Sequence, residues 1–263
     1  MTLGELYGGH LAAVSATADR ALAAGGYDGL ITCSGSPLYY YLDDSTYPFR
    51  PNPRYRYWLP DNSPDCFVVH RPGQRPKLVF HQPDDYWYLP PEAPEGYWVA
   101  HFDVMVVRSP AELRQAVGPG RWAILGEPTP ATAGLGEHDP APVTGPLDYA
   151  RAVKTPYEIE CMAEATIAGV RAHRAAEKAF RAGASEYEIH LAYCRAAGAR
   201  EEELPYNNII AFDRHAAVLH YQVLDRSRPS GVKSFLIDAG AQHAGYACDI
   251  TRTYSAEAGE FLD

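Results

Sequence analysis

Two aspartates near the end of the sequence have the spacing of a pair that could act together. Asp238 and Asp249 each end a short apolar run within "FLIDAGAQHAGYACDITRTY", residues 235–254. The runs "KSFLID" and "YACDITRT" are typical of strands, and the glycines at 240 and 245 favour a hairpin between them. A turn centred between His243 and Ala244 would place Asp238 directly opposite Asp249, on one face of the hairpin.

Such a pair has two interpretations. Opposed residues have Cβ atoms about 4.5–5.5 Å apart, so two carboxylates there repel each other and shift each other's pKa. A cation relieves this repulsion, and two carboxylates can bridge divalent ions about 3.5–4 Å apart. In the structural alternative, one aspartate ends a strand and the other accepts a hydrogen bond from Thr251 or Thr253. The spacing alone leaves both interpretations open.

The elements that would position this pair follow from local signals in the second half of the chain. In "TPYE", residues 155–158, a capping threonine, a first-turn proline and a capping-box glutamate predict a helix to about Arg181. "SEYE" from Ser185 predicts a second helix in the same way. Strands are predicted in "NNIIAF", "AVLHY", "KSFLIDAG" and "YACDITRTY". Helices followed by strands indicate an α+β domain, assigned to residues 151–263.

The first half alternates helices and strands, which indicates an α/β domain over residues 1–150. An amphipathic helix is expected over Leu3–Ala24, and "CFVVH" and "KLVFH" are expected to form a hairpin. Further strands are predicted in "DGLITC", "DVMVV" and "WAILGE", with a helix beginning at Ser109. Residues 127–146 are rich in proline and glycine and are interpreted as a domain junction.

Composition excludes several classes of protein. The 263 residues carry a formal net charge of −10, which argues against a nucleic-acid or anionic-membrane surface. An uninterrupted run of about 18 apolar residues is absent from the sequence, and the N-terminus does not resemble a secretory signal. The five cysteines are scattered without CxxC spacing, which is typical of reduced thiols and disfavours a cysteine metal site. A cytoplasmic protein is expected.

Several stretches in the same order resemble one family. "SFLIDAGAQHAGYACDITRTYS", with "YLDDSTYPFRPNPRYRYWLP", "DYWYLPP" and "HAAVLHYQVLD", resembles the Xaa-Pro dipeptidase (prolidase) branch of the pita-bread metallopeptidases. Within that branch the chain is similar to the bacterial prolidases that include organophosphorus acid anhydrolases. The resemblance implies a creatinase/prolidase-like α/β domain, a pita-bread catalytic domain, homodimers, and hydrolysis of dipeptides ending in proline.

The resemblance also implies a dinuclear metal site. In this family two divalent cations, usually manganese with zinc or cobalt as alternatives, are held by two aspartates, one histidine and two glutamates. Asp238 would bind one ion and Asp249 would bridge both, while Thr251 would orient a ligand.

Four further residues match family positions that contact substrate. His220 in "VLHY" would contact the substrate during catalysis, and Tyr206 and Leu219 would line the substrate pocket. Asp44 would reach the partner subunit's active site and meet the substrate's amino group. Without the match, His220 would be a histidine satisfied within a strand, Tyr206 and Leu219 core residues, and Asp44 part of a turn. His215 is given a structural role only.

The family's histidine and two glutamate ligands lie downstream of "DITRT", and after Tyr254 this sequence reads only "SAEAGEFLD". We therefore expect a partial catalytic domain, truncated after the second ligand strand and inactive alone. A substitute site using His243, Glu257 or Glu260 is disfavoured, because affinity needs a complete, oriented set of ligands. Two hypotheses remain: a portion of a prolidase that needs the C-terminal segment as a separate chain, or a non-catalytic dimeric module.

Overall fold

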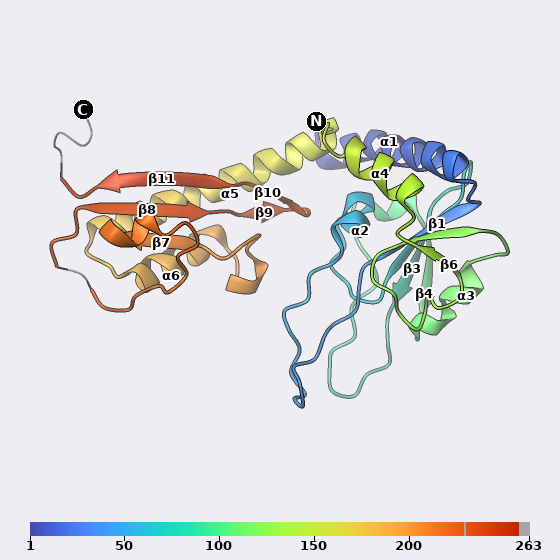
Figure 1. Cartoon of the computed structure of the whole chain (residues 1–263), viewed down its shortest axis with the longest axis horizontal. Helices are drawn as coiled ribbons and strands as arrows, with labels where there is room; N and C mark the ends of the chain where they lie inside the picture. The colour runs from blue at the N-terminus through green and yellow to red at the C-terminus, as the bar shows by residue number, and fades with distance from the viewer. Residues whose placement is uncertain (229, 258–263) are drawn as a thin grey trace. The chain divides into compact units, whose positions relative to one another are not determined.

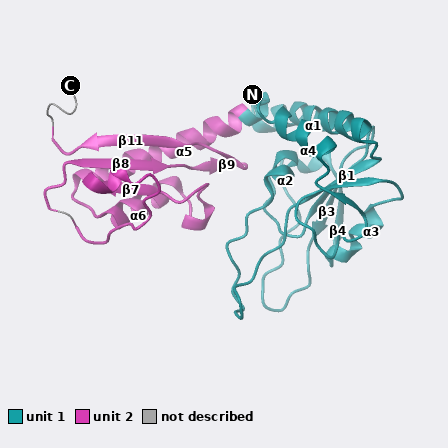
Figure 2. Cartoon of the chain, viewed as in Figure 1, with its two compact units in different colours: residues 1–158 teal, residues 159–263 magenta. Residues whose placement is uncertain are grey.

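A computed structural model describes residues 1–228 and 230–257 of the chain (Figure 1). It divides into two compact units, Met1–Glu158 and Ile159–Asp263 (Figure 2). Across the described residues, a helix both long and apolar enough to span a membrane is absent.

The first unit is a mixed sheet with helices. Its helices are α1 (Leu3–Gly25), α2 (Pro53–Trp58), α3 (Leu113–Ala116) and α4 (Ala141–Ala150), with 3-10 turns η1 (Val99–His101) and η2 (Pro110–Glu112). Its strands are β1 (Gly29–Cys33), β2 (Phe67–His70), β3 (Lys77–His81), β4 (Asp103–Val107), β5 (Trp122–Leu125) and β6 (Gly136–His138). The strand order is β4-β3-β2-β1-β5-β6. The predicted β2–β3 hairpin is confirmed as an antiparallel pair.

Residues 127–146 are not a junction, contrary to the sequence-based interpretation. Strand β6 pairs in parallel with β5, and α4 packs beside α1 within the first unit. The Arg54 guanidinium holds this segment in place, with contacts of 2.7 Å to Asp139 and 2.8 Å to Asp148. Pro140 precedes α4 and Pro142 lies in its first turn, where a proline is tolerated, while Pro146 lies inside the helix.

The second unit packs two helices on a small antiparallel sheet. Its elements are α5 (Pro156–Arg181), which begins in the first unit, α6 (Glu186–Ala197), η3 (Glu201–Glu203), β7 (Ile209–Phe212), η4 (Asp213–Ala217), β8 (Ser234–Ala239), β9 (Gln242–His243), β10 (Tyr246–Ala247) and β11 (Ile250–Ser255). Both predicted capping boxes are present, at Thr155–Glu158 and at Ser185–Glu188. The sheet order is β11-β8-β7.

The core of this unit lies between the helices and one face of the sheet. Phe180 of α5 packs against Phe212 of β7 and Phe235 of β8, and Ile189 and Tyr193 of α6 complete the buried cluster. The expected order, an α/β unit followed by an α+β unit, is confirmed. The strand predicted in "AVLHY" is wrong: that segment forms the end of η4 and a turn.

Candidate active site

The hairpin that carries Asp238 and Asp249 has a different register from the one expected. Asp238 pairs with Thr251, and His243 pairs with Tyr246. The intervening Ala244-Gly245 turn has positive φ at both residues, 48° and 93°, as a type I′ turn requires. The turn is thus centred one residue later than predicted, which shifts the pairing by two, and the prediction that the aspartates lie directly opposite each other is wrong.

The two carboxylates nevertheless converge. A shift of two residues keeps the side chain on the same face, so Asp249 lies diagonally from Asp238. The hydroxyl of Tyr206 lies 2.9 Å from Oδ1 of Asp238 and 2.8 Å from Oδ1 of Asp249. Asp238 is half-buried and Asp249 is exposed. Three residues that the sequence singled out therefore meet at one point.

Tyr206 supplies a single proton to two negatively charged groups, so its hydroxyl can donate to only one of them at a time. Burial, followed by the hydrogen bonds to Asp249 and Asp238, raises the pKa of Tyr206. The hydroxyl therefore stays protonated. In the described part of the chain it is the one recorded side-chain donor to this pair, which leaves most of the carboxylate lone pairs available to another ligand.

Gly240 allows the Tyr206 ring to lie close to the hairpin. A Cβ atom at position 240 would collide with the Cys248 carbonyl oxygen and would lie 2.9 Å from Cε1 of Tyr206. The ladder is irregular at the same point, because the Ala241 amide donates to the Cys248 thiol sulfur at 3.3 Å. Asp249 lies in this interruption, between β10 and β11.

A buried histidine that sequence reasoning missed supports the strand beneath the pair. Nε2 of His173, on α5, lies 3.0 Å from the carbonyl oxygen of Ala239, the neighbour of Asp238. Burial lowers the pKa of His173, and the neutral ring donates its Nε2 proton to that carbonyl. Its place on the buried face of a predicted amphipathic helix was the available signal.

Few other side chains near the pair could donate a hydrogen bond to it or join it in binding a metal ion. Thr251 is exposed, and the described residues record no hydrogen bond from Thr251 or Thr253 to either aspartate, so the structural alternative has no support there. Within residues 1–228 and 230–257, no group of three histidine, cysteine or acidic side chains could hold a metal ion. His243 and Glu257 are exposed. Glu260 lies outside the described residues. The aspartates thus provide two oxygen donors suited to a hard cation, and no third donor joins them there.

The predicted substrate residues are distributed differently. Leu219 is 86% exposed and adjoins the exposed His220 in the turn after η4. His215 is bonded through Nδ1 to Glu186 at 2.9 Å, a structural contact. Asp44 belongs to the first unit, in an exposed turn where the Ser45 amide donates to Asp43.

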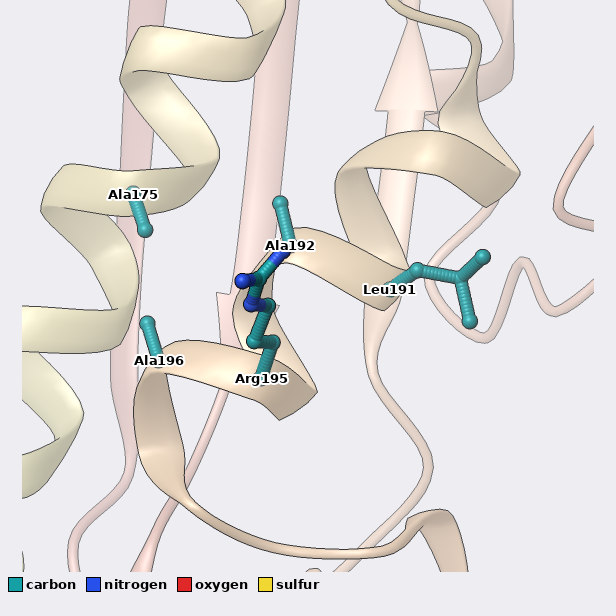
Figure 3. Close-up of a pocket in the computed structure, with 5 residues that line it drawn as sticks. All are labelled: Ala175, Leu191, Ala192, Arg195 and Ala196. Atoms are coloured by element: carbon teal, nitrogen blue, oxygen red, sulfur yellow. The ribbon is translucent and has the colours of Figure 1, made fainter.

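A shallow hollow between α5 and α6 is a separate feature (Figure 3). Its lining, among the described residues, consists of Ala175, Leu191, Ala192, Arg195 and Ala196. Arg195 is its charged member, and the lining contains neither a carboxylate nor an imidazole, so the hollow is not a metal site.

Comparison with known proteins connects this geometry to one family. Residues 5–149 match the profile of the Xaa-Pro dipeptidase N-terminal domain, and residues 160–261 match metallopeptidase family M24. The Xaa-Pro dipeptidase of Stenotrophomonas maltophilia (strain K279a) is 51% identical over 257 residues, covering 97% of this chain and 58% of that protein. The Xaa-Pro dipeptidase of Xanthomonas campestris pv. campestris (strain B100) is 50% identical, covering 98% and 59%.

Solved structures show the same fold. Aminopeptidase P from E. coli with the inhibitor Pro-Leu superimposes with a TM-score of 0.71 at 20% identity, covering 97% of this chain and 62% of that one. The zinc-substituted form of aminopeptidase P in complex with product gives 0.67 at 19% identity, with the same two coverages. The chain spans 58% and 59% of the length of these two dipeptidases. On the match of its N-terminal domain and the M24 sequence that follows, the chain belongs to the Xaa-Pro dipeptidase family of metallopeptidases.

Proposed function

We propose that the protein takes part in hydrolysis of dipeptides whose second residue is proline, with two divalent cations at the aspartate pair. The observation that carries the proposal is the convergence of Asp238 and Asp249 on one hydroxyl, in a chain of this family. An Xaa-Pro bond has no N–H group, so its recognition depends on the carbonyl and on the two ends of the dipeptide.

Asp238 and Asp249 would hold the cations, and Thr251, opposite Asp238 in the ladder, would orient the Asp238 carboxylate. The cations, manganese in preference to zinc or cobalt, polarise the scissile carbonyl and activate water when bound. We place the remaining ligands in the part of the relatives that this chain does not span.

The substrate is bound by four residues in this proposal. Tyr206 and Leu219 line the pocket, and His220 contacts the dipeptide near the scissile bond. Asp44 meets the amino group in the active site of a partner subunit, which requires a homodimer. The exposure of Leu219 and His220 side by side supports a contact with a molecule other than this chain.

A reducing compartment, the cytoplasm, is part of the same proposal. The five cysteines are buried and form no disulfide, which is how thiols occur in proteins of reducing compartments.

The test is hydrolysis of glycyl-proline with added Mn²⁺ by the chain mixed with the C-terminal segment of a relative as a second polypeptide, compared between the wild type and Asp249→Asn. We expect Asp249→Asn to lower the rate more than about 100-fold, because a ligand is lost. Asp103→Asn, an exposed aspartate in β4, is the matched control and retains the wild-type rate. Equal rates for Asp249→Asn and the wild type would contradict the proposed site.

A non-catalytic dimeric module is the second candidate, favoured by the lack of a third donor within the described residues. The two are separated by adding the C-terminal segment of a relative as a second polypeptide. Turnover of glycyl-proline in that mixture supports the dipeptidase. A stable complex that neither binds Mn²⁺ nor hydrolyses glycyl-proline supports the module.

A further inference from the structure

Glu186, the first residue of α6, is a buried carboxylate that the proposed mechanism does not use. Its side chain is 1% exposed, and four donors from different parts of the chain surround it. Oε1 accepts from the Phe212 amide at 3.0 Å and lies 2.9 Å from His215 Nδ1. Oε2 accepts from the Tyr221 hydroxyl at 2.7 Å and from the Asp225 amide at 2.9 Å. A carboxylate with four donors has its acceptor capacity filled.

The four donors lie on both sides of one exposed turn. The rings of His215 and Tyr221 stack with centroids 4.5 Å apart, so Glu186 and this stack hold the two ends of the turn together. Within the turn the Val218 amide donates to His215 at 3.0 Å, and the Tyr221 amide donates to Val218 at 3.2 Å. Leu219 is at the tip.

The backbone of the same segment is constrained further. Asp213 and Leu224 have positive φ values of 45° and 53°. This conformation is uncommon for residues other than glycine and is maintained here by surrounding contacts. The Asp213 carboxylate accepts from the Ser234 amide at 2.8 Å, and the Tyr187 amide donates to the Asp225 carbonyl oxygen at 3.1 Å. The turn is thus tied to the start of α6 and to the start of β8.

We propose that Glu186 is a positioning residue, which sets the Leu219–His220 turn for the substrate through its bonds to Phe212, His215, Tyr221 and Asp225. The inference rests on the proposed function, in which Leu219 and His220 contact the dipeptide. Glu186 is buried beneath that turn and acts only through its four partners. Side chains that contact a substrate must be held in a defined position, and a hydrogen-bond network of this kind holds them.

The test measures order in the turn without requiring catalysis. Hydrogen exchange at the amides of Val218 and Tyr221 is compared among the wild type, Glu186→Met and Glu186→Gln. Met has no acceptor, so we expect exchange about tenfold faster or more. Gln retains one carbonyl oxygen, and its amide can donate to the Tyr221 hydroxyl, so we expect partial rescue.

The matched control is Glu188→Met, two residues along α6, which removes a charge bonded to Arg228 and to Ser185 and makes no recorded bond to the turn. We expect it to leave exchange at residues 218–221 unchanged. Tyr221→Phe, which deletes one of the four donors and keeps the ring stack, serves if Glu186→Met does not fold. Faster exchange confined to the turn in Glu186→Met or Tyr221→Phe supports positioning. Unchanged exchange in the turn, or an equal rise throughout β7 and β8, overturns it.

Glycyl-proline kinetics in a preparation with turnover give the second readout. We expect Glu186→Gln to lower kcat/KM more than about tenfold, with a smaller effect for Tyr221→Phe. If the wild type shows no turnover even with the C-terminal segment of a relative added, and the turn is disordered in the variants, the dipeptidase function is rejected and the positioning role is kept. A wild type with turnover and an unchanged kcat/KM in Glu186→Gln rejects the positioning role alone.

Discussion

Glu186 and the pair Asp238–Asp249 lie in the same unit, and they are satisfied very differently. Glu186 has four donors within 3.0 Å and is almost completely buried. The two aspartates share a single hydroxyl, and Asp249 is exposed. A carboxylate whose acceptor positions are all hydrogen-bonded (a filled carboxylate) stabilises the fold, because its removal leaves its donors without a partner. A carboxylate pair with few donors (an underfilled pair) retains a mutual repulsion that a cation can relieve. In the proposals above, the aspartate pair holds the cations and Glu186 positions the Leu219–His220 turn.

The largest expected effect concerns the filled carboxylate. Glu186→Met should lower the free energy of unfolding by about 3 kcal/mol, because the buried amide of Phe212 and the amide of Asp225 both lose their acceptor. Urea denaturation of the purified chain, with Glu188→Met as control, measures this. If Glu186→Met loses no more unfolding free energy than Glu188→Met, the buried carboxylate does not stabilise the fold more than an exposed one.

A smaller effect is expected at Gly240, where the backbone leaves room for Tyr206. Gly240→Ala places a methyl group against the Cys248 carbonyl oxygen and the Tyr206 ring, which should cost about 2 kcal/mol. It should also move the Tyr206 hydroxyl away from the aspartates. Thermal unfolding gives the first quantity, and the chemical shifts of the Tyr206 ring give the second. Wild-type values in both would show that the close approach is not required.

Neutralising one aspartate of the Asp238–Asp249 pair should raise the free energy of unfolding, whereas the two substitutions above lower it. Asp249→Asn removes one of two repelling charges while keeping the shape, so the unfolding free energy should rise by less than about 1 kcal/mol in metal-free buffer. Asp238→Asn should behave alike. Urea denaturation with a chelator present checks this, and a clear loss of stability in both variants would mean that the pair is structural.

The smallest effect is a pH dependence at an exposed carboxylate. The hydrogen bond from Arg228 lowers the pKa of Glu188 to about 2 from an ordinary 4.5. Because the folded-state pKa is depressed, the stabilisation is complete above pH 4.5 and is lost as the pH falls toward 2. The stability difference between wild type and Glu188→Gln should therefore disappear over that range. A difference that persists at pH 2 would assign the effect to another group.

Local signals were sufficient for much of this fold. The capping boxes at Thr155 and Ser185 predict the starts of α5 and α6, and the β2–β3 hairpin follows from two apolar runs. The capping boxes join residues three positions apart, and the hairpin pairs residues 8 to 12 positions apart, so both depend on short stretches of sequence.

Features that depend on distant partners were predicted poorly. The Ala244-Gly245 turn has a positive φ at Ala244, which alanine rarely adopts, so local preference did not indicate this turn centre. The "AVLHY" segment has the composition of a strand, but the amides of Phe212 and Asp225 on either side of it donate to Glu186, which is 26 and 39 residues away in the sequence. The sequence did not predict the role of Glu186 for the same reason, although the capping box at Ser185, directly before it, was predicted.

The candidate site shows the same division. Alternation along the strands correctly placed Asp238 and Asp249 on one face, since a register error of two residues preserves the face. The contact with Tyr206 joins residues 32 and 43 positions apart, and spacing alone could not have predicted it.

The position of the Tyr206 hydroxyl between the aspartates makes this phenol an optical reporter. A cation bound by the two carboxylates would compete with the hydroxyl for the Oδ1 atoms, and weakening of those hydrogen bonds alters the near-ultraviolet absorption of the ring. Titration with a colourless divalent ion would therefore yield a difference spectrum from the protein itself. The same titration of Tyr206→Phe measures the absorbance change of the other 18 of the 19 tyrosines, which is then subtracted. Occupancy of the site could then be followed without a dye, an isotope or a substrate.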